Sequence, residues 1–140
     1  MLGGPTDETN PNDWFLFASD RLKSADRLWQ AEGLTMSGIE LLQEAVERYL
    51  KGYLIANGWR LERTHDLKSL MDDATRFESQ FKGFGNFAIE LAEDFFAQHY
   101  PGGDLTDVGK NYENLRQKAG DMVQLIQQKL PQYFAKPPTT

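Results

Sequence analysis

Hydrophobic residues recur every three or four positions along most of the chain, which is the period of a helix that buries one face. In the first such segment, the apolar positions are Trp14, Ala18, Leu22, Ala25 and Trp29. Polar residues fall between them. The pattern predicts a helix that starts at Asp13, is capped by Asn12 or Asp13, and ends at Gly33.

The broadest apolar stripe predicts a long central helix. Its members are Ile39, Leu42, Ala45, Val46, Tyr49, Leu50, Tyr53 and Leu54. Thr35 or Ser37 can cap its start, and Ser37 and Glu40 stand at capping-box spacing. The Asn57-Gly58 pair supplies a left-handed residue that ends it.

Three further stripes predict three more helices. The third helix starts near Thr64 to Asp66, and two glycines between residues 78 and 85 end its pattern. A fourth, capped by Asn86, stops before Pro101. A fifth follows the Pro-Gly-Gly-Asp turn and is ended by Pro131. No segment alternates with period two, so we predict an all-α fold, an antiparallel bundle of four to five helices.

Length and composition favour one domain without a membrane segment. The chain has 140 residues, 40% of them hydrophobic, which suits one bundle over residues 13–134 between disordered tails at residues 1–12 and 135–140. No run approaches the roughly 20 apolar residues of a membrane helix. The absence of cysteine excludes disulfides and thiolate catalysis. We therefore expect a cytoplasmic protein without membrane contact.

Candidate chemistry centres on the two histidines, because they are the chain's stock of near-neutral bases. If the third and fourth helices are antiparallel neighbours, His65 and His99 approach one end of the bundle. The same end would then hold the cationic and aromatic side chains of Arg60, Arg63, Lys68 and Tyr100. Such a cluster predicts binding of a phosphate-bearing ligand, even though the net charge of -6 argues against a generic nucleic-acid coat. In a catalytic version, His65 deprotonates a ribose hydroxyl while Arg60 steadies the phosphorane charge.

Each of these residues also has an ordinary structural interpretation. His65 can simply cap a helix, and Arg60 and Arg63 can pair with nearby acids such as Glu62. The helix dipole alone favours His99 in a last turn. Glu47 and Lys51, one turn apart, are expected to form a surface ion pair, or the stem of Lys51 to pack against the protein, rather than to hold a ligand. The scattered carboxylates have no metal-ligand spacing, so no metal and no cofactor is predicted.

Several motifs occur in a fixed order along the chain. They are Gln43-Glu44-Ala45-Val46-Glu47-Arg48, His65-Asp66-Leu67, and Tyr100-Pro101 before the last helix. The series resembles the HEPN family, the higher eukaryotes and prokaryotes nucleotide-binding domain, over about residues 13–134. The resemblance implies a helical bundle like the substrate-binding subunits of nucleotidyltransferases. Such a bundle usually dimerises, and it is often encoded beside or fused to a nucleotidyltransferase domain.

Many HEPN relatives are ribonucleases, some of them toxins, and use an Arg-x4-6-His motif whose Arg and His meet across the dimer. Here no Arg lies four to six residues before His99, and only Arg60 and His65 have that spacing. We therefore expect a binding or partner module, homodimeric, with a nucleotidyltransferase partner and a nucleotide or RNA ligand. The alternative is a metal-independent endoribonuclease, the toxin of a toxin–antitoxin pair, that uses Arg60 and His65.

Aromatic residues are numerous for one small bundle and favour a dimer interface. The competing interpretation is that Phe81, Phe84 and Phe87 cover the open end of the bundle within one chain. The sequence supports both interpretations about equally.

Overall fold

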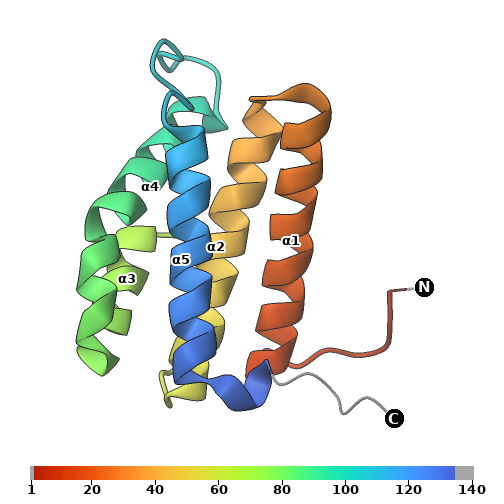
Figure 1. The fold of residues 1–140 in the computed structure, drawn as a ribbon, viewed down its shortest axis with the longest axis vertical. Coiled ribbons are helices and arrows are strands. Elements are labelled where there is room, and N and C mark those ends of the chain that lie inside the picture. The colour runs from red at the N-terminus through yellow and green to blue at the C-terminus, as the bar shows by residue number, and fades with distance from the viewer. Residues whose placement is uncertain (1, 135–140) are drawn as a thin grey trace.

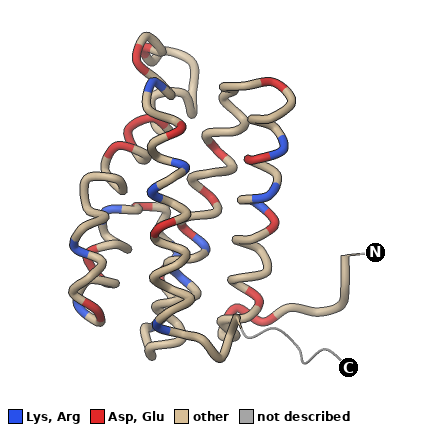
Figure 2. The backbone as a smooth tube through the Cα atoms, viewed as in Figure 1, with Lys and Arg blue, Asp and Glu red and all other residues tan. Residues whose placement is uncertain are grey.

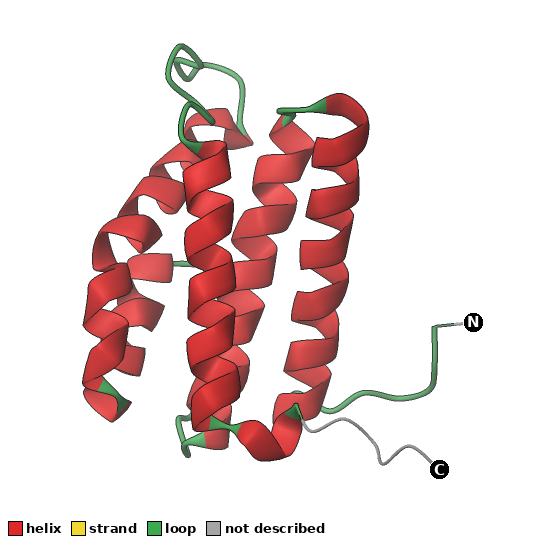
Figure 3. Cartoon of the chain, viewed as in Figure 1, coloured by secondary structure: helices red, strands yellow, loops and turns green. Residues whose placement is uncertain are grey.

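The computed structural model describes residues 2–134, and helices account for most of that range (Figure 1, Figure 3). The elements are α1 (Pro11–Glu32), α2 (Met36–Ala56), α3 (Leu67–Phe77), the 3-10 helix η1 (Ser79–Phe84), α4 (Gly85–His99), α5 (Tyr112–Lys129) and the 3-10 helix η2 (Pro131–Tyr133). No strand occurs within residues 2–134, which confirms the all-α prediction. The predicted tail 135–140 lies outside the described residues.

The first two helices form an antiparallel pair joined by a short turn (Figure 1). Of the two predicted caps for α2, it is Thr35 that serves, since its Oγ1 accepts from the Gly38 N–H at 2.9 Å. A Cβ at Gly52 would lie 2.6 Å from the Phe15 ring, so the two helices approach each other at a point that only glycine permits. This approach sets α1 closely against α2.

Two predicted helix starts are wrong by a small margin. α1 begins at Pro11, two residues before the predicted boundary at residue 13, because Asn10 caps it by accepting from the Asn12 N–H at 3.0 Å. α4 begins at Gly85 without a side-chain cap. The predicted cap Asn86 is not used because η1 continues directly into α4.

Aromatic residues near η1 fill the interior of the single chain. Phe81 is completely buried and stacks at a tilt on Tyr53, with ring centroids 4.7 Å apart, and Phe87 is buried as well. Phe84 is half-buried against both. These three residues therefore pack against one another within a single chain.

The connection between α2 and α3 returns alongside α2. Gly58, with φ of 86°, ends α2, and residues 59–66 are non-helical until Asp66 caps α3. The Gln43 side chain on α2 donates to the carbonyl of His65 at 3.3 Å. This hydrogen bond holds the end of the connection against the middle of α2. Within residues 2–134, no helix has the length and apolar character needed to span a membrane.

Candidate functional site

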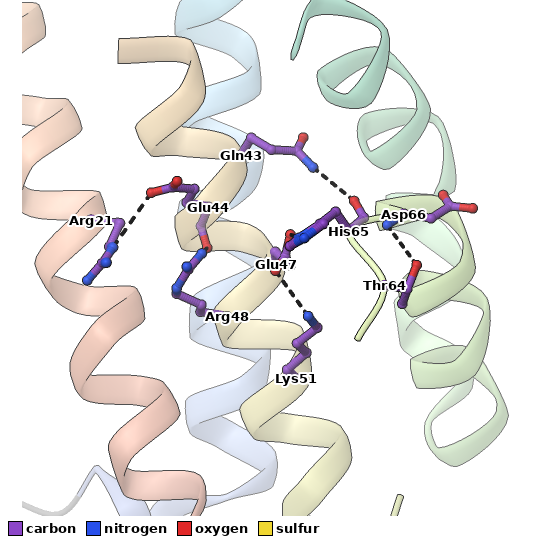
Figure 4. A network of polar contacts seen from close by, with 9 residues as sticks. All are labelled: Arg21, Gln43, Glu44, Glu47, Arg48, Lys51, Thr64, His65 and Asp66. Carbon is purple, nitrogen blue, oxygen red and sulfur yellow. Dashed lines mark hydrogen bonds and ion pairs between the residues drawn. The ribbon is translucent and has the colours of Figure 1, made fainter. Parts of the chain in front are cut away.

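A buried carboxylate on α2 organises the site. One oxygen of Glu47 accepts from Lys51 Nζ at 3.1 Å, and the other lies 2.9 Å from His65 Nδ1 (Figure 4). The side chains of Glu47 and Lys51 are each 5% exposed, whereas that of His65 is 75% exposed. A buried ion pair therefore contacts an imidazole that faces solvent.

The prediction of a surface ion pair between Glu47 and Lys51 is wrong in its location. The i, i+4 spacing does bring the two charges together, but both side chains are buried rather than on the surface. The Trp14 ring lies over Lys51, with Nζ 5.7 Å from the ring centroid, and adds a cation–π contact. Burial makes each charge depend on the other, because an unpaired ion in the interior is strongly unfavourable.

The contact with Glu47 fixes the tautomer of the neutral His65 ring. A carboxylate can only accept, so Nδ1 carries the proton and Nε2 keeps its lone pair. When the ring is protonated instead, Nε2–H becomes a cationic donor. The neutral ring can thus act as a base through Nε2, and the protonated ring can donate a hydrogen bond to a phosphate oxygen. Its predicted role as a simple helix cap is filled by Asp66, whose side chain accepts from the Lys68 and Ser69 amides.

Gln43, one helical turn before Glu47 on α2, supports the same site (Figure 4). It is 1% exposed, its Nε2 donates to the His65 carbonyl, and its Oε1 has no hydrogen-bond partner within the described range. The amide therefore positions the backbone of His65, while Glu47 orients the side chain. Neither residue was singled out by the sequence as a partner of His65, because only the path of the connection brings them together.

The other predicted residues of the connection lie along its surface. Arg63 pairs with Glu8 instead of the expected Glu62, through Nη2 and both carboxylate oxygens at 3.0 and 3.1 Å. Lys68 pairs with Asp72. Arg60 lies in the connection four residues after α2 and lines a hollow with Gly58, Trp59 and Arg63. No hydrogen bond or ion pair joins it to His65 in the part of the chain described.

His99 and Tyr100 stand apart from this group. His99 Nδ1 lies 3.7 Å from Oε1 of Glu40, and its ring stacks on Phe95, while Tyr100 is 75% exposed beside it. Glu40 precedes Glu47 by seven residues, about 10 Å along the helix axis. The structure therefore divides the predicted ligand-binding residues into two groups rather than gathering them at one end.

A second polar cluster joins α1 to α5. Arg116 donates to both oxygens of Asp26 at 2.6 and 2.9 Å, and this hydrogen bonding raises the pKa of Arg116. The Trp29 and Tyr112 rings stack at 4.8 Å beside the pair. Burial raises the pKa of Tyr112, whose hydroxyl has no partner within residues 2–134. Asp26 and Arg116 are 90 positions apart in the sequence, so no local spacing predicts this cluster.

Carboxylates elsewhere are engaged in local pairs. Asp73 pairs with Arg76, and Glu90 accepts from the Asn111 side chain. Within the described range, no group of three or more histidine and acidic side chains is arranged to hold a metal ion.

Comparison with known proteins identifies the family. The sequence model of the HEPN domain matches residues 11–129, which is most of the chain and includes both histidines. Neither a curated protein nor a solved structure gives a significant match. The all-helical bundle agrees with the family match. The chain therefore belongs to the HEPN domain family.

Proposed function

We propose that this chain is a non-catalytic binding module for a phosphate-bearing ligand, a nucleotide or RNA, with His65 as the central contact. The observation that carries the proposal is an exposed imidazole fixed on a buried Glu47–Lys51 pair. Membership of a family of nucleotide-binding and ribonuclease-like modules supports the ligand class.

Charge around His65 supports an anionic ligand. Arg60, Arg63 and Lys68 lie within five residues of His65, in a chain whose net charge is -6. Phosphate oxygens are bound in proteins by such cationic donors, with Arg offering a planar pair of N–H groups. The same segment also contains two acids, Glu62 and Asp66, but its three cations outnumber them, so it is less negative than the rest of the molecule.

Binding measurements test this proposal. The affinity of a fluorescently labelled oligouridylate, and of ATP, is measured for the wild type, His65→Ala and the matched control His99→Ala. We expect His65→Ala to weaken binding about tenfold, the effect of one lost charged hydrogen bond, and His99→Ala to leave it unchanged. Equal affinities for all three proteins would contradict the proposal.

We further propose that the module is a homodimer and that it works with a nucleotidyltransferase. The homodimer is supported by apolar side chains exposed where α1 meets α2 and α4 meets the next loop, at one end of the bundle (Figure 1). They are Leu34, Met36, Phe96, Tyr100 and Leu105. Such a patch favours association. Light scattering should give twice the monomer mass for the wild type, and the double variant Phe96→Asp, Tyr100→Asp should give the monomer mass.

The nucleotidyltransferase partner is proposed from the family resemblance alone. Co-purification of this chain with a nucleotidyltransferase tests it.

A metal-independent endoribonuclease is the second candidate, because Glu47 holds His65 in the tautomer of a general base. Nε2 would take the proton of the ribose 2′-hydroxyl, and the 2′-oxygen would attack phosphorus. The 5′-oxygen would leave with a proton from water, producing a 2′,3′-cyclic phosphate. Arg60, supplied by this chain or by a second copy, would stabilise the added charge.

An RNA-cleavage assay in EDTA separates the two candidates. An endoribonuclease should cleave under these conditions and lose its activity in both His65→Ala and Arg60→Ala. A binding module should show no turnover while retaining its affinity for RNA. A toxin role would require the first of these outcomes.

A further inference from the structure

A short segment before α1, Thr6–Asn10, lies against the body of the protein, and we call it the N-terminal strap. Asp7 folds it into a tight turn, since its Oδ1 accepts from the Thr9 N–H at 2.8 Å and the Thr9 hydroxyl at 2.7 Å. The Asp7 N–H donates in turn to Asp13 Oδ2 at 2.8 Å. The turn presents Glu8 toward the α2–α3 connection.

Glu8 is bonded at both its backbone and its side chain. Its carbonyl accepts from Trp14 Nε1 at 2.7 Å, and its carboxylate accepts from Arg63 Nη2 at 3.0 and 3.1 Å. Trp14 is the residue that covers Lys51, and Arg63 is two residues from His65. Glu8 therefore contacts two residues, Trp14 and Arg63, that neighbour the candidate site.

The hollow beneath Glu8 has the donors of an anion site. It is lined by the strap and by the connection, including Gly58, Trp59, Arg60 and Arg63. Arg63 is paired with Glu8, whereas Arg60 forms no ion pair within residues 2–134. The guanidinium group of Arg60 therefore has no acidic partner in that range. Carboxylate and phosphate use the same planar arginine donors, and Glu8 supplies the carboxylate here.

We propose that this hollow is a phosphate subsite of the RNA or nucleotide ligand, and that Glu8 occupies it in the absence of ligand. The inference rests on the proposed function. It adds a second ligand contact, the hollow at Arg63, and a carboxylate of the same chain, Glu8, that competes with the ligand for it. Arg63 and His65 are separated by at most about 7 Å between Cα atoms, because they are two residues apart. One ligand can therefore place a phosphate on Arg63 and a neighbouring group on His65.

The competition is weak enough to be reversed by a ligand. The side chains of Glu8 and Arg63 are 53% and 78% exposed, and such exposed pairs contribute little to stability. A phosphodiester carries one negative charge, as the carboxylate does, and binds the same arginine donors, so a ligand with further contacts nearby displaces Glu8. Removing the charge of Glu8 should then raise the affinity for RNA about two- to fivefold, the size of a surface ion pair.

The test compares Glu8→Gln with Glu62→Gln in the full chain. Both variants lose one negative charge, but Glu62 is exposed in the same connection and has no part in the Arg63 pair. Binding of the labelled oligouridylate is measured by fluorescence anisotropy. We expect tighter binding for Glu8→Gln than for Glu62→Gln, and we expect the gain to vanish when Arg63→Ala is present in both proteins.

The outcomes separate this inference from the proposed function. Wild-type binding that depends on His65, with equal affinities for Glu8→Gln and Glu62→Gln, would overturn the inference and leave the proposed function standing. A gain for Glu8→Gln that needs Arg63, with no effect of His65→Ala, would support the subsite and contradict the role of His65. Absence of RNA binding by every variant would overturn both.

Discussion

Two histidines lie beside two glutamates of the same helix, yet their surroundings differ. His65 Nδ1 is 2.9 Å from a Glu47 side chain that is 5% exposed, and His99 Nδ1 is 3.7 Å from a Glu40 side chain that is 44% exposed. Glu47 has Lys51 as a second partner. Glu40 forms no second ion pair within the described residues. His65 is therefore held by a buried carboxylate, whereas His99 lies beside an exposed carboxylate and stacks on Phe95.

The difference shows that the burial of the glutamate, and not residue type, decides how firmly the carboxylate of a His–Glu pair is held. An exposed pair competes with water and contributes about 0–1 kcal/mol. Neighbouring charge separates the regions further, because α4 carries Glu90, Glu93 and Asp94 but no Lys or Arg (Figure 2). Arg60, Arg63 and Lys68, in contrast, lie within five residues of His65 along the chain. An anionic ligand is therefore suited to the His65 region and not to the His99 region.

Lys51→Met should have the largest effect, because it leaves the Glu47 carboxylate buried without its principal partner. We expect the free energy of unfolding to fall by about 3–5 kcal/mol, as for other broken buried pairs. Urea denaturation at pH 7 measures it. The control is Glu40→Gln at the exposed pair, for which a change within about 0.5 kcal/mol is expected.

A double variant tests the physical reason. Glu47→Leu combined with Lys51→Met removes both charges, so it should recover much of the stability lost by Lys51→Met alone. A double variant less stable than Lys51→Met would mean that the loss comes from packing. The distinction drawn between the buried and the exposed pair would then fail.

Most of the fold follows from local sequence patterns, and the contacts of the site do not. Periodicity predicts all five helices, and Gly58 and Asp66 mark real ends because capping depends on adjacent residues. Contact between Glu47 and His65 depends on the path of residues 57–66, which have no periodic pattern. Glu8 and Arg63 are 55 residues apart, and no local signal relates them. His65 was found by its chemistry, but its partners required the structure.

Gly52→Ala should have an intermediate effect on the buried side of the comparison. The new Cβ would lie 2.6 Å from the Phe15 ring, which forces α1 away from α2 next to the Trp14–Lys51 contact. Overpacking of this kind costs about 1–3 kcal/mol, more than the helix propensity gained from Ala. Thermal and urea unfolding measure the change.

The control for Gly52→Ala is Gly83→Ala in η1, where a Cβ would meet no atom within 4 Å. That variant should be close to the wild type in stability. If Gly52→Ala were as stable as Gly83→Ala, α1 and α2 would separate at no cost. The close approach would then have no role in fixing Trp14 over Lys51.

Asp94→Asn should have the smallest effect, on the acidic side of the comparison. Burial raises the pKa of Asp94, with repulsion from Glu90 and Glu93 adding to it, although the Gly109 N–H bond at 3.2 Å opposes the shift. An acid whose pKa is higher in the folded state loses stability as pH rises from its unfolded pKa through its folded pKa. The wild type therefore carries a penalty at pH 7 that is absent at pH 3. Asparagine still accepts from Gly109 and carries no penalty.

Asp104→Asn is the matched control for Asp94→Asn, because its shift has the opposite sign. Hydrogen bonds from Thr106 lower the pKa of Asp104, so its charge favours the folded state above the unfolded pKa, and this contribution is lost as pH falls. Relative to the wild type, Asp94→Asn should gain stability between pH 3 and pH 7, and Asp104→Asn should lose it. Denaturation at both pH values measures the two differences. If both variants changed stability in the same direction, the loss of one negative charge, and not the burial of Asp94, would determine how stability changes with pH.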